Sequence, residues 1–228
     1  MLQIGGVISG GVLIAFGIGA IVLSLNGRST VNDSLKQEQI TGSPDMTPTA
    51  IAGEVSAAKA AQSKLVSQLE SVGVKITPSP IEAPSCSLAG KQVENGSDAR
   101  CFAHYMRIHT FEATSGLTYS QMGRYAAKPG TPLKYTDGLG GTNDPQHAAT
   151  DPKTQQPVNN GRRDIWVTYT ALTTALNSSY MASQLALFGL VVGIALLLAG
   201  IGFVVLALGA LKEAPTASRE RVAAASSP

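Results

Sequence analysis

Hydrophobic residues are concentrated in two runs of this chain, over residues 2–25 and over residues 185–211. Each run reaches the roughly 20 apolar residues that a helix needs to cross a bilayer. A core helix of a soluble protein carries a polar face, and neither run has one. The pattern therefore predicts two transmembrane helices, over residues 1–27 and 185–211.

The second run continues an amphipathic pattern without a break. Apolar residues recur at helical spacing before it, at Ile165, Tyr169, Leu172, Leu176 and Tyr180. No proline interrupts this stretch, and no charged residue lies between Asp164 and Lys212. We therefore expect one long helix, in which residues 163–184 form a stalk in water and residues 185–211 form the second span.

The first run differs from a cleaved signal peptide in several ways. No Lys or Arg precedes it, its apolar part is longer than the roughly 7–15 residues of a signal core, and no A-x-A site follows. We expect a retained anchor. A cleaved signal peptide, or two buried helices of a soluble protein, are the alternatives.

Two spans place both termini on one side of the membrane. Lys212, Arg219 and Arg221 follow the second span, and an excess of Lys and Arg near a span end favours the cytoplasm. We expect both termini in the cytoplasm and residues 28–183 outside it. The tail, residues 212–228, is expected to be disordered.

Residues 28–162 predict a small helical domain. Helical spacing continues from the first run to Ile40 and then ends. Thr47 can cap a helix whose first position is Pro48, where a missing N–H costs nothing. The apolar residues of this helix alternate three and four apart up to Val72, which is typical of a helix that packs along another helix.

One long helix, one short helix and a loop are expected after it. Ser97 or Asp98 can cap a helix over residues 99–113, and Thr118 can cap a short helix that runs through Tyr125. Residues 129–160 are rich in Gly, Pro, Thr, Asn and Asp. They predict a long loop, and such loops are either functional or disordered.

Both cysteines, Cys86 and Cys101, lie in this domain. Disulfides persist in oxidising compartments, and a bridge here would close a loop of about 15 residues, which contributes ~3 kcal/mol by the loop-entropy model. We expect a disulfide, with two free thiols as the alternative. The predicted fold class is an all-α membrane protein with two spans and a small disulfide-linked extracytoplasmic domain.

Small residues recur along both runs. Gly6 and Gly10 form one small-xxx-small pair, and Gly189 and Gly193 form another, which lets helix backbones approach closely in lipid. We expect the two spans to pack antiparallel, with Gly6 level with the end of the second run and Gly17 level with Gly193. Other glycine-containing faces of the two spans would remain free to pack against a partner.

Three segments resemble a group of actinobacterial two-span membrane proteins without an established activity. They are Asp45-Met46-Thr47-Pro48, Tyr105-Met106-Arg107-Ile108-His109 and Leu185-Ala186-Leu187-Phe188-Gly189. The resemblance covers most of the chain and implies an actinobacterial plasma membrane. Many members of the group carry an automatic label, aromatic ring-opening dioxygenase.

The residues do not favour the chemistry of that label. Ring-opening dioxygenases hold iron with two His and one carboxylate. His104 and His109 are five residues apart, about 140° around a helix, so they do not share a face. His109 and Glu112 can share one, but the second His would then come from a loop, as His147 does. We expect no metal and no cofactor.

Other catalytic motifs are equally weak. The chain has no G-x-S-x-G elbow, and the glycine-rich residues 138–141 are not followed by the Lys of a P-loop. Neither span contains an ionisable residue, so transport by this chain alone is not expected. The net charge is +2 and no basic stripe with aromatics is present, so nucleic acid is not an expected partner.

The densest set of hydrogen-bonding side chains is Arg107, His109, Glu112, Tyr119, Arg124 and Tyr125. This set can line a polar pocket, form a protein contact, or serve only in capping and surface pairing. Trp166, the only tryptophan, is a candidate interface anchor or a core residue.

We expect a non-enzymatic accessory or scaffold subunit of a plasma-membrane complex. Its expected partners are the lipid bilayer and other integral membrane proteins or further copies of the chain. An extracytoplasmic ligand-binding or sensing module is one alternative, and a metal-dependent enzyme is another.

Overall fold

Residues 2–209 are described in the computed structural model of the chain, and the predicted tail over residues 212–228 lies outside them. The chain forms two units. Residues 1–32 and 181–228 belong to one, which we call the two-helix unit, and residues 33–180 form the other, which we call the central unit.

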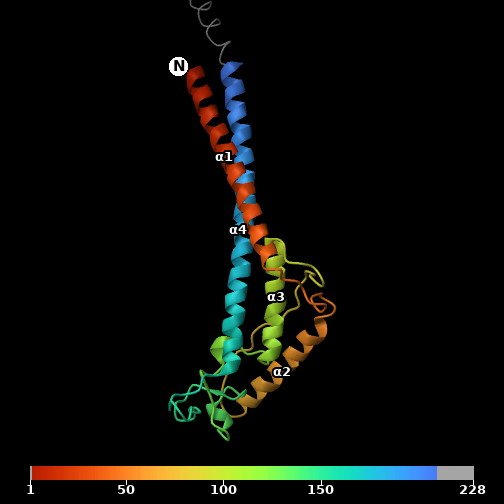
Figure 1. Ribbon diagram of the computed structural model, residues 1–228, viewed down its shortest axis with the longest axis vertical. Helices are drawn as coiled ribbons and strands as arrows, with labels where there is room; N and C mark the ends of the chain where they lie inside the picture. The colour runs from red at the N-terminus through yellow and green to blue at the C-terminus, as the bar shows by residue number, and fades with distance from the viewer. Residues whose placement is uncertain (1, 210–228) are drawn as a thin grey trace, which may run out of the picture. The chain divides into compact units, whose positions relative to one another are not determined.

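Four α-helices contain most of the described residues: α1 (Leu2–Gln37), α2 (Ala52–Glu70), α3 (Gly96–Ala113) and α4 (Gly161–Leu208) (Figure 1). The prediction of a mostly helical protein is therefore confirmed. Helices α1 and α4 are long and apolar enough to cross a membrane. The expected continuity of the last helix is also confirmed, because α4 runs unbroken over 48 residues.

Helices α1 and α4 pack on each other through glycines within the two-helix unit, where they lie side by side (Figure 1). A Cβ atom at Gly10 would lie 2.7 Å from the carbonyl oxygen of Gly200. A Cβ at Gly193 would lie 2.9 Å from the carbonyl oxygen of Gly17. Only glycine permits backbones to approach this closely, so the close packing and its expected level at Gly17 and Gly193 are confirmed.

The core of the central unit forms where α2 packs on α3. Helix α2 buries Val55, Ala58, Gln62, Leu65 and Leu69, which are three or four residues apart, as the sequence predicted. The largest fully buried side chains of the unit include Tyr105, Phe111 and Ile108 of α3. Since α3 buries residues on several sides, it is the helix around which the unit is built.

The starts of both helices differ from the prediction. Helix α2 begins at Ala52 rather than Pro48, because Thr47 caps the turn that precedes it: its Oγ1 accepts the N–H of Ala50 at 3.1 Å. Helix α3 is capped by Asn95 rather than Ser97 or Asp98. The Asn95 Oδ1 accepts the N–H of Asp98 at 3.0 Å, and its Nδ2 donates to the Asp98 carboxylate at 2.6 Å. Asp98 thus completes a reciprocal cap instead of starting the helix.

The segment between α3 and α4 is irregular but ordered by hydrogen bonds. A 3-10 turn, η1 (Tyr119–Gln121), follows Thr118, whose N–H donates to the Gln121 side chain at 2.8 Å. The expected short helix through Tyr125 is therefore wrong in its extent, because the turn ends at Gln121 and Tyr125 begins a strand. A second 3-10 turn is η2 (Leu133–Tyr135). Strands β1 (Tyr125–Ala126) and β2 (Gly141–Thr142) pair antiparallel, which departs from the purely helical expectation.

Asp137 organises this loop. Its Oδ1 accepts the N–H groups of Leu139 and Gly141, and its Oδ2 accepts that of Gly123, all at 2.8 Å. Asn160 donates a further bond to the Gly123 carbonyl at 2.8 Å. One buried carboxylate therefore binds the segments before β1 and around β2, which explains order in a stretch that has no long helix or strand.

Candidate functional site

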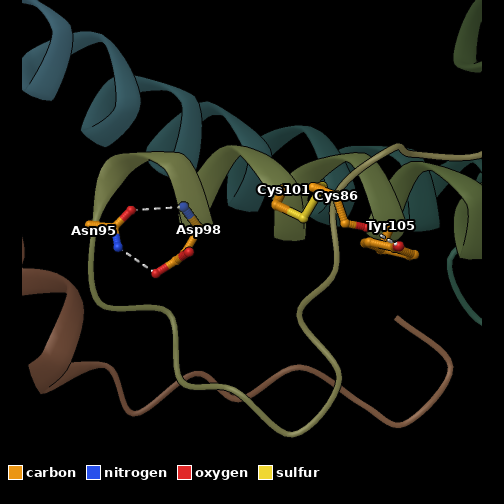
Figure 2. Close-up of a disulfide and its surroundings, with 5 residues drawn as sticks. All are labelled: Cys86, Asn95, Asp98, Cys101 and Tyr105. Carbon is orange, nitrogen blue, oxygen red and sulfur yellow. Dashed lines mark hydrogen bonds between the residues drawn. A yellow bond between two sulfur atoms is a disulfide. The ribbon is translucent and has the colours of Figure 1, made fainter. Parts of the chain in front are cut away.

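The predicted disulfide between Cys86 and Cys101 is present, with Cα atoms 6.0 Å apart. Figure 2 shows Cys101 and Tyr105 at successive turns of α3, both engaging Cys86. The Tyr105 hydroxyl donates to the Cys86 carbonyl at 2.6 Å, and burial, with the nearby charge of Asp45, raises the pKa of this phenol above its ordinary value. The segment before α3 is thus held on the helix at two points.

A cavity of about 390 Å³ lies beside this disulfide in the central unit. Its polar lining consists of Arg100 and His104 from α3, the hydroxyls of Ser85 and Ser97, and Tyr180 from α4. The Arg100 guanidinium lies over the Tyr180 ring, 4.7 Å from its centroid. The lining therefore contains cationic and neutral donors and no carboxylate.

Arg100, His104 and Arg107 lie four and three residues apart on α3, so they share one face of the helix. Arg107 lies 4.8 Å from the Phe111 ring centroid and 5.8 Å from that of Trp166. Burial lowers the pKa of His104 from its ordinary 6.5, and the charges of Arg100 and Arg107 lower it further. On this face of α3, the positive charges of two arginines therefore flank His104.

A second cluster joins His109 of α3 to two carboxylates. Asp45 Oδ2 lies 3.2 Å from the ring Nε2, and Glu54 Oε2 lies 3.1 Å from Nδ1. The Glu54 oxygen is buried but outside hydrogen-bonding geometry, so its contact with the ring is electrostatic. These three groups are the residues that could hold a metal ion. As they stand, each ring nitrogen faces a different carboxylate, whereas a metal takes only one imidazole nitrogen.

The sequence did not reveal this cluster. His109 was paired with Glu112, which lies three residues away, but Glu112 is exposed and is not part of the cluster. Asp45 precedes α2 and Glu54 lies in its first turn, so both are far from His109 in sequence. No spacing rule connects them, because the packing of α2 on α3 brings them together.

The polar residues between Arg107 and Tyr125 that the sequence singled out do not lie together in the structure. Arg107 packs on aromatic rings, His109 lies between carboxylates, and the Arg163 guanidinium lies 3.8 Å from the Tyr119 ring centroid. Arg124 lies over the ring of its neighbour Tyr125, 6.0 Å from the centroid. The structure thus places these side chains in separate local contacts, which is closest to the expected surface pairing.

Trp166 is a core residue of the central unit. Its side chain is 5% exposed, and its indole N–H donates to the Leu117 carbonyl at 2.8 Å. The Phe111 ring packs on it edge to face, with centroids 5.4 Å apart. Of the two roles that the sequence left open, the structure selects the core and excludes the exposed anchor.

The third histidine, His147, belongs to the loop. It lies 2.8 Å from the Asp144 carboxylate and stacks on Tyr135 with centroids 4.3 Å apart. The Gln146 N–H and then His147 lower the pKa of Asp144. A cavity of about 600 Å³ lies nearby, and its charges are balanced, with Lys75 and Lys134 against Asp137 and Asp144.

No protein-family model matches the chain, and no curated protein or solved structure matches it.

Proposed function

We propose that this protein is a two-span protein of a bacterial plasma membrane and acts as a non-enzymatic accessory or scaffold subunit of a membrane complex. The observation that carries the proposal is the apolar surface of the two-helix unit. Leu23 is 74% exposed and Phe188 is 67% exposed. Only 11% and 17% of the most apolar stretches of α1 and α4 are buried. Apolar surface on this scale marks contact with lipid or protein.

The proposed orientation follows from charge and redox chemistry. Lys212, Arg219 and Arg221 follow the second span and favour a cytoplasmic location for both termini. The disulfide between Cys86 and Cys101 favours an oxidising compartment for the central unit. Two independent features therefore support the same placement, with residues 28–183 outside the cell membrane.

A docking role is supported by exposed apolar side chains in the central unit. Val167 lies on the part of α4 that belongs to this unit, and it is 53% exposed although its neighbour Trp166 is buried. Apolar side chains that a domain leaves in water are candidates for burial against a partner. We propose that this face of α4 contacts another integral membrane protein or a second copy of the chain.

A non-enzymatic role is supported by what the polar clusters do. Asp137 binds backbone N–H groups, Arg107 packs on rings, and His147 joins its own loop through Asp144. Each of these groups is occupied in holding the central unit together, so none of them is poised for proton transfer or nucleophilic attack on a substrate.

The proposal is tested by extraction from native membranes in a mild detergent, followed by native mass spectrometry. We expect the protein to be recovered with a second membrane protein in a simple ratio, or as an oligomer. Recovery as a lone monomer would contradict the accessory role. Solubility without detergent would contradict the membrane assignment.

Two matched variants test the docking face. Val167→Asp places a charge on the exposed face of α4 and is expected to reduce recovery of the partner. Val72→Asp, at a valine after α2 that is also exposed, is the control and should leave recovery unchanged. If Val167→Asp and Val72→Asp reduced recovery of the partner equally, the partner would not bind at Val167.

A further inference from the structure

We propose that the cavity beside the Cys86–Cys101 disulfide binds a phosphate group, held by Arg100 and His104 with the hydroxyls of Ser85 and Ser97 at its edge. This binding activity goes beyond docking on a partner protein. It uses residues of the central unit that the proposed accessory function leaves without a role.

The charge of the cavity selects an anion. Arg100 and His104 line it, Arg107 lies one turn beyond His104, and no carboxylate is part of the lining. Two other cavities of the central unit contain both signs of charge, with Lys75 and Lys134 beside Asp137 and Asp144 in one and Lys59 with Glu82 in the other. Neighbouring positive charges repel one another, and a bound anion offsets that repulsion.

The donor types favour phosphate. A guanidinium presents a planar fork of N–H groups that matches two oxygens of a phosphate. The Tyr180 ring beneath Arg100 orients this fork. His104 and two serine hydroxyls add donors on the same cavity, and a phosphate has enough oxygens to accept from all of them.

The backbone on both sides of the cavity is cross-linked. The disulfide joins the segment at Cys86 to α3, and the Tyr105 hydroxyl bonds the Cys86 carbonyl one turn further along. Ser97, Arg100 and His104 all project from α3 itself. A site on a helix that is clamped in this way loses little entropy on binding.

The position of Tyr180 favours a lipid headgroup as the source of the phosphate. In the sequence, Tyr180 precedes the uncharged run that begins at Leu185 by five residues. The headgroup layer extends roughly 5–7 Å beyond the hydrocarbon on each side of a bilayer. This choice of source rests on the proposed membrane location, whereas the phosphate site does not.

The test uses the full-length protein with labelled histidines and follows the titration of His104 by NMR. In one arm, inorganic phosphate is added to protein in a neutral detergent. In the other, the protein is placed in nanodiscs of phosphatidylcholine with or without phosphatidylglycerol. We expect phosphate and phosphatidylglycerol each to raise the pKa of His104, because a nearby anion favours the imidazolium.

The two arms separate the sources. A response to inorganic phosphate without one to phosphatidylglycerol supports the site and assigns it to a soluble phosphate. A response in neither arm overturns the proposal. The phosphate arm contains neither a bilayer nor a partner, so its failure is distinct from failure of the accessory role.

Substitutions test the residues. Arg100→Gln should weaken phosphate binding between about tenfold and a hundredfold, as expected for a hydrogen bond to a charged group. Arg100→Lys keeps the positive charge but lacks the planar guanidinium. Its phosphate affinity should therefore lie between those of the unsubstituted protein and Arg100→Gln. Arg124→Gln, in the same unit but over Tyr125, is the control and should bind normally.

Two outcomes of these substitutions would overturn the proposal. One is an unchanged affinity in Arg100→Gln. The other is a His104 shift with phosphatidylglycerol that persists in that variant, since it would reflect only the surface potential of the bilayer. If Arg100→Gln does not fold, His104→Gln provides the second variant, and its phosphate affinity is measured by calorimetry. An unchanged affinity in His104→Gln would also reject the site.

Discussion

At the scale of single residues, the pKa of His104 responds to the positive charges on α3. Burial, then Arg100 and Arg107, lower its pKa from the ordinary 6.5. Between the folded and unfolded pKa values the unfolded chain binds more protons, so stability rises with pH there. The contribution of His104 to the free energy of unfolding is therefore fully present above pH 6.5 and decreases as the pH falls below that value.

NMR titration of the three histidines checks this expectation. His104 should titrate below 6.5, and Arg107→Gln should raise its pKa toward that value by removing one of the two charges that lower it. Arg124→Gln should leave the titration unchanged. A midpoint at or above 6.5 in the unsubstituted protein would contradict the description of this face.

Asp137 gives a second prediction at this scale. Asp137→Ala leaves the N–H groups of Gly123, Leu139 and Gly141 without their acceptor and should cost ~3 kcal/mol of stability. Asp137→Asn keeps one carbonyl oxygen and should cost less. Thermal unfolding measures the cost, and hydrogen exchange should be faster at these amides in Asp137→Ala. Unchanged exchange would mean that the carboxylate does not hold the loop.

Single-residue roles were the least predictable from sequence. The disulfide and the Thr118 cap followed from local rules and are present. The contacts of His109 with Asp45 and Glu54 depend on α2 packing against α3, and no spacing encodes them. Trp166 was ambiguous because its role depends on whether Leu117 offers a carbonyl to its indole, which is a tertiary contact.

At the scale of elements, the packing of α1 on α4 depends on glycine at particular positions. Gly10 faces Gly200, whereas Gly11 has no atom within 4 Å of where its Cβ would lie. Gly10→Val should therefore cost about 1–3 kcal/mol by overpacking, and Gly11→Val, with the same change in side chain, should cost much less. Unfolding of the full-length protein in detergent measures the difference. Equal costs would show that the two helices do not meet at Gly10.

The disulfide supplies a second prediction for an element. Replacing Cys86 and Cys101 together by serine removes a constraint on the unfolded chain and should lower the stability of the central unit by ~3 kcal/mol. Denaturant unfolding with and without a reductant provides the measurement, since reduction of the unsubstituted protein should reproduce the loss. A midpoint that reduction does not move would show that the bridge contributes nothing.

Helices were predictable as elements, and their first residues were not. The apolar runs and three-four spacings identified α1, α2 and α4 because burial on one face imposes a period on the sequence. The first residue of a helix depends on which of several adjacent capping residues accepts the free N–H groups of the first turn. Asn95 takes the cap of α3 because Asp98 can return its hydrogen bond. The β1–β2 pair escaped prediction because two-residue strands leave no periodic pattern.

At the scale of the whole molecule, α1 and α4 each supply residues to both units. The same helices that present apolar side chains in the two-helix unit therefore also contain residues of the central unit. The proposed membrane position thus bears directly on the central unit, and its orientation can be tested there.

Labelling of single cysteines in intact cells decides this orientation. The sequence contains two cysteines, Cys86 and Cys101, and they are joined to each other, so a cysteine introduced elsewhere supplies the free thiol. Lys153→Cys lies at an exposed position of the loop and should react with a membrane-impermeant maleimide added outside. Ser218→Cys, beyond the second run, should react only after the cells are permeabilised. The reverse pattern would place the central unit in the cytoplasm, where a disulfide does not persist, and would contradict the proposed topology.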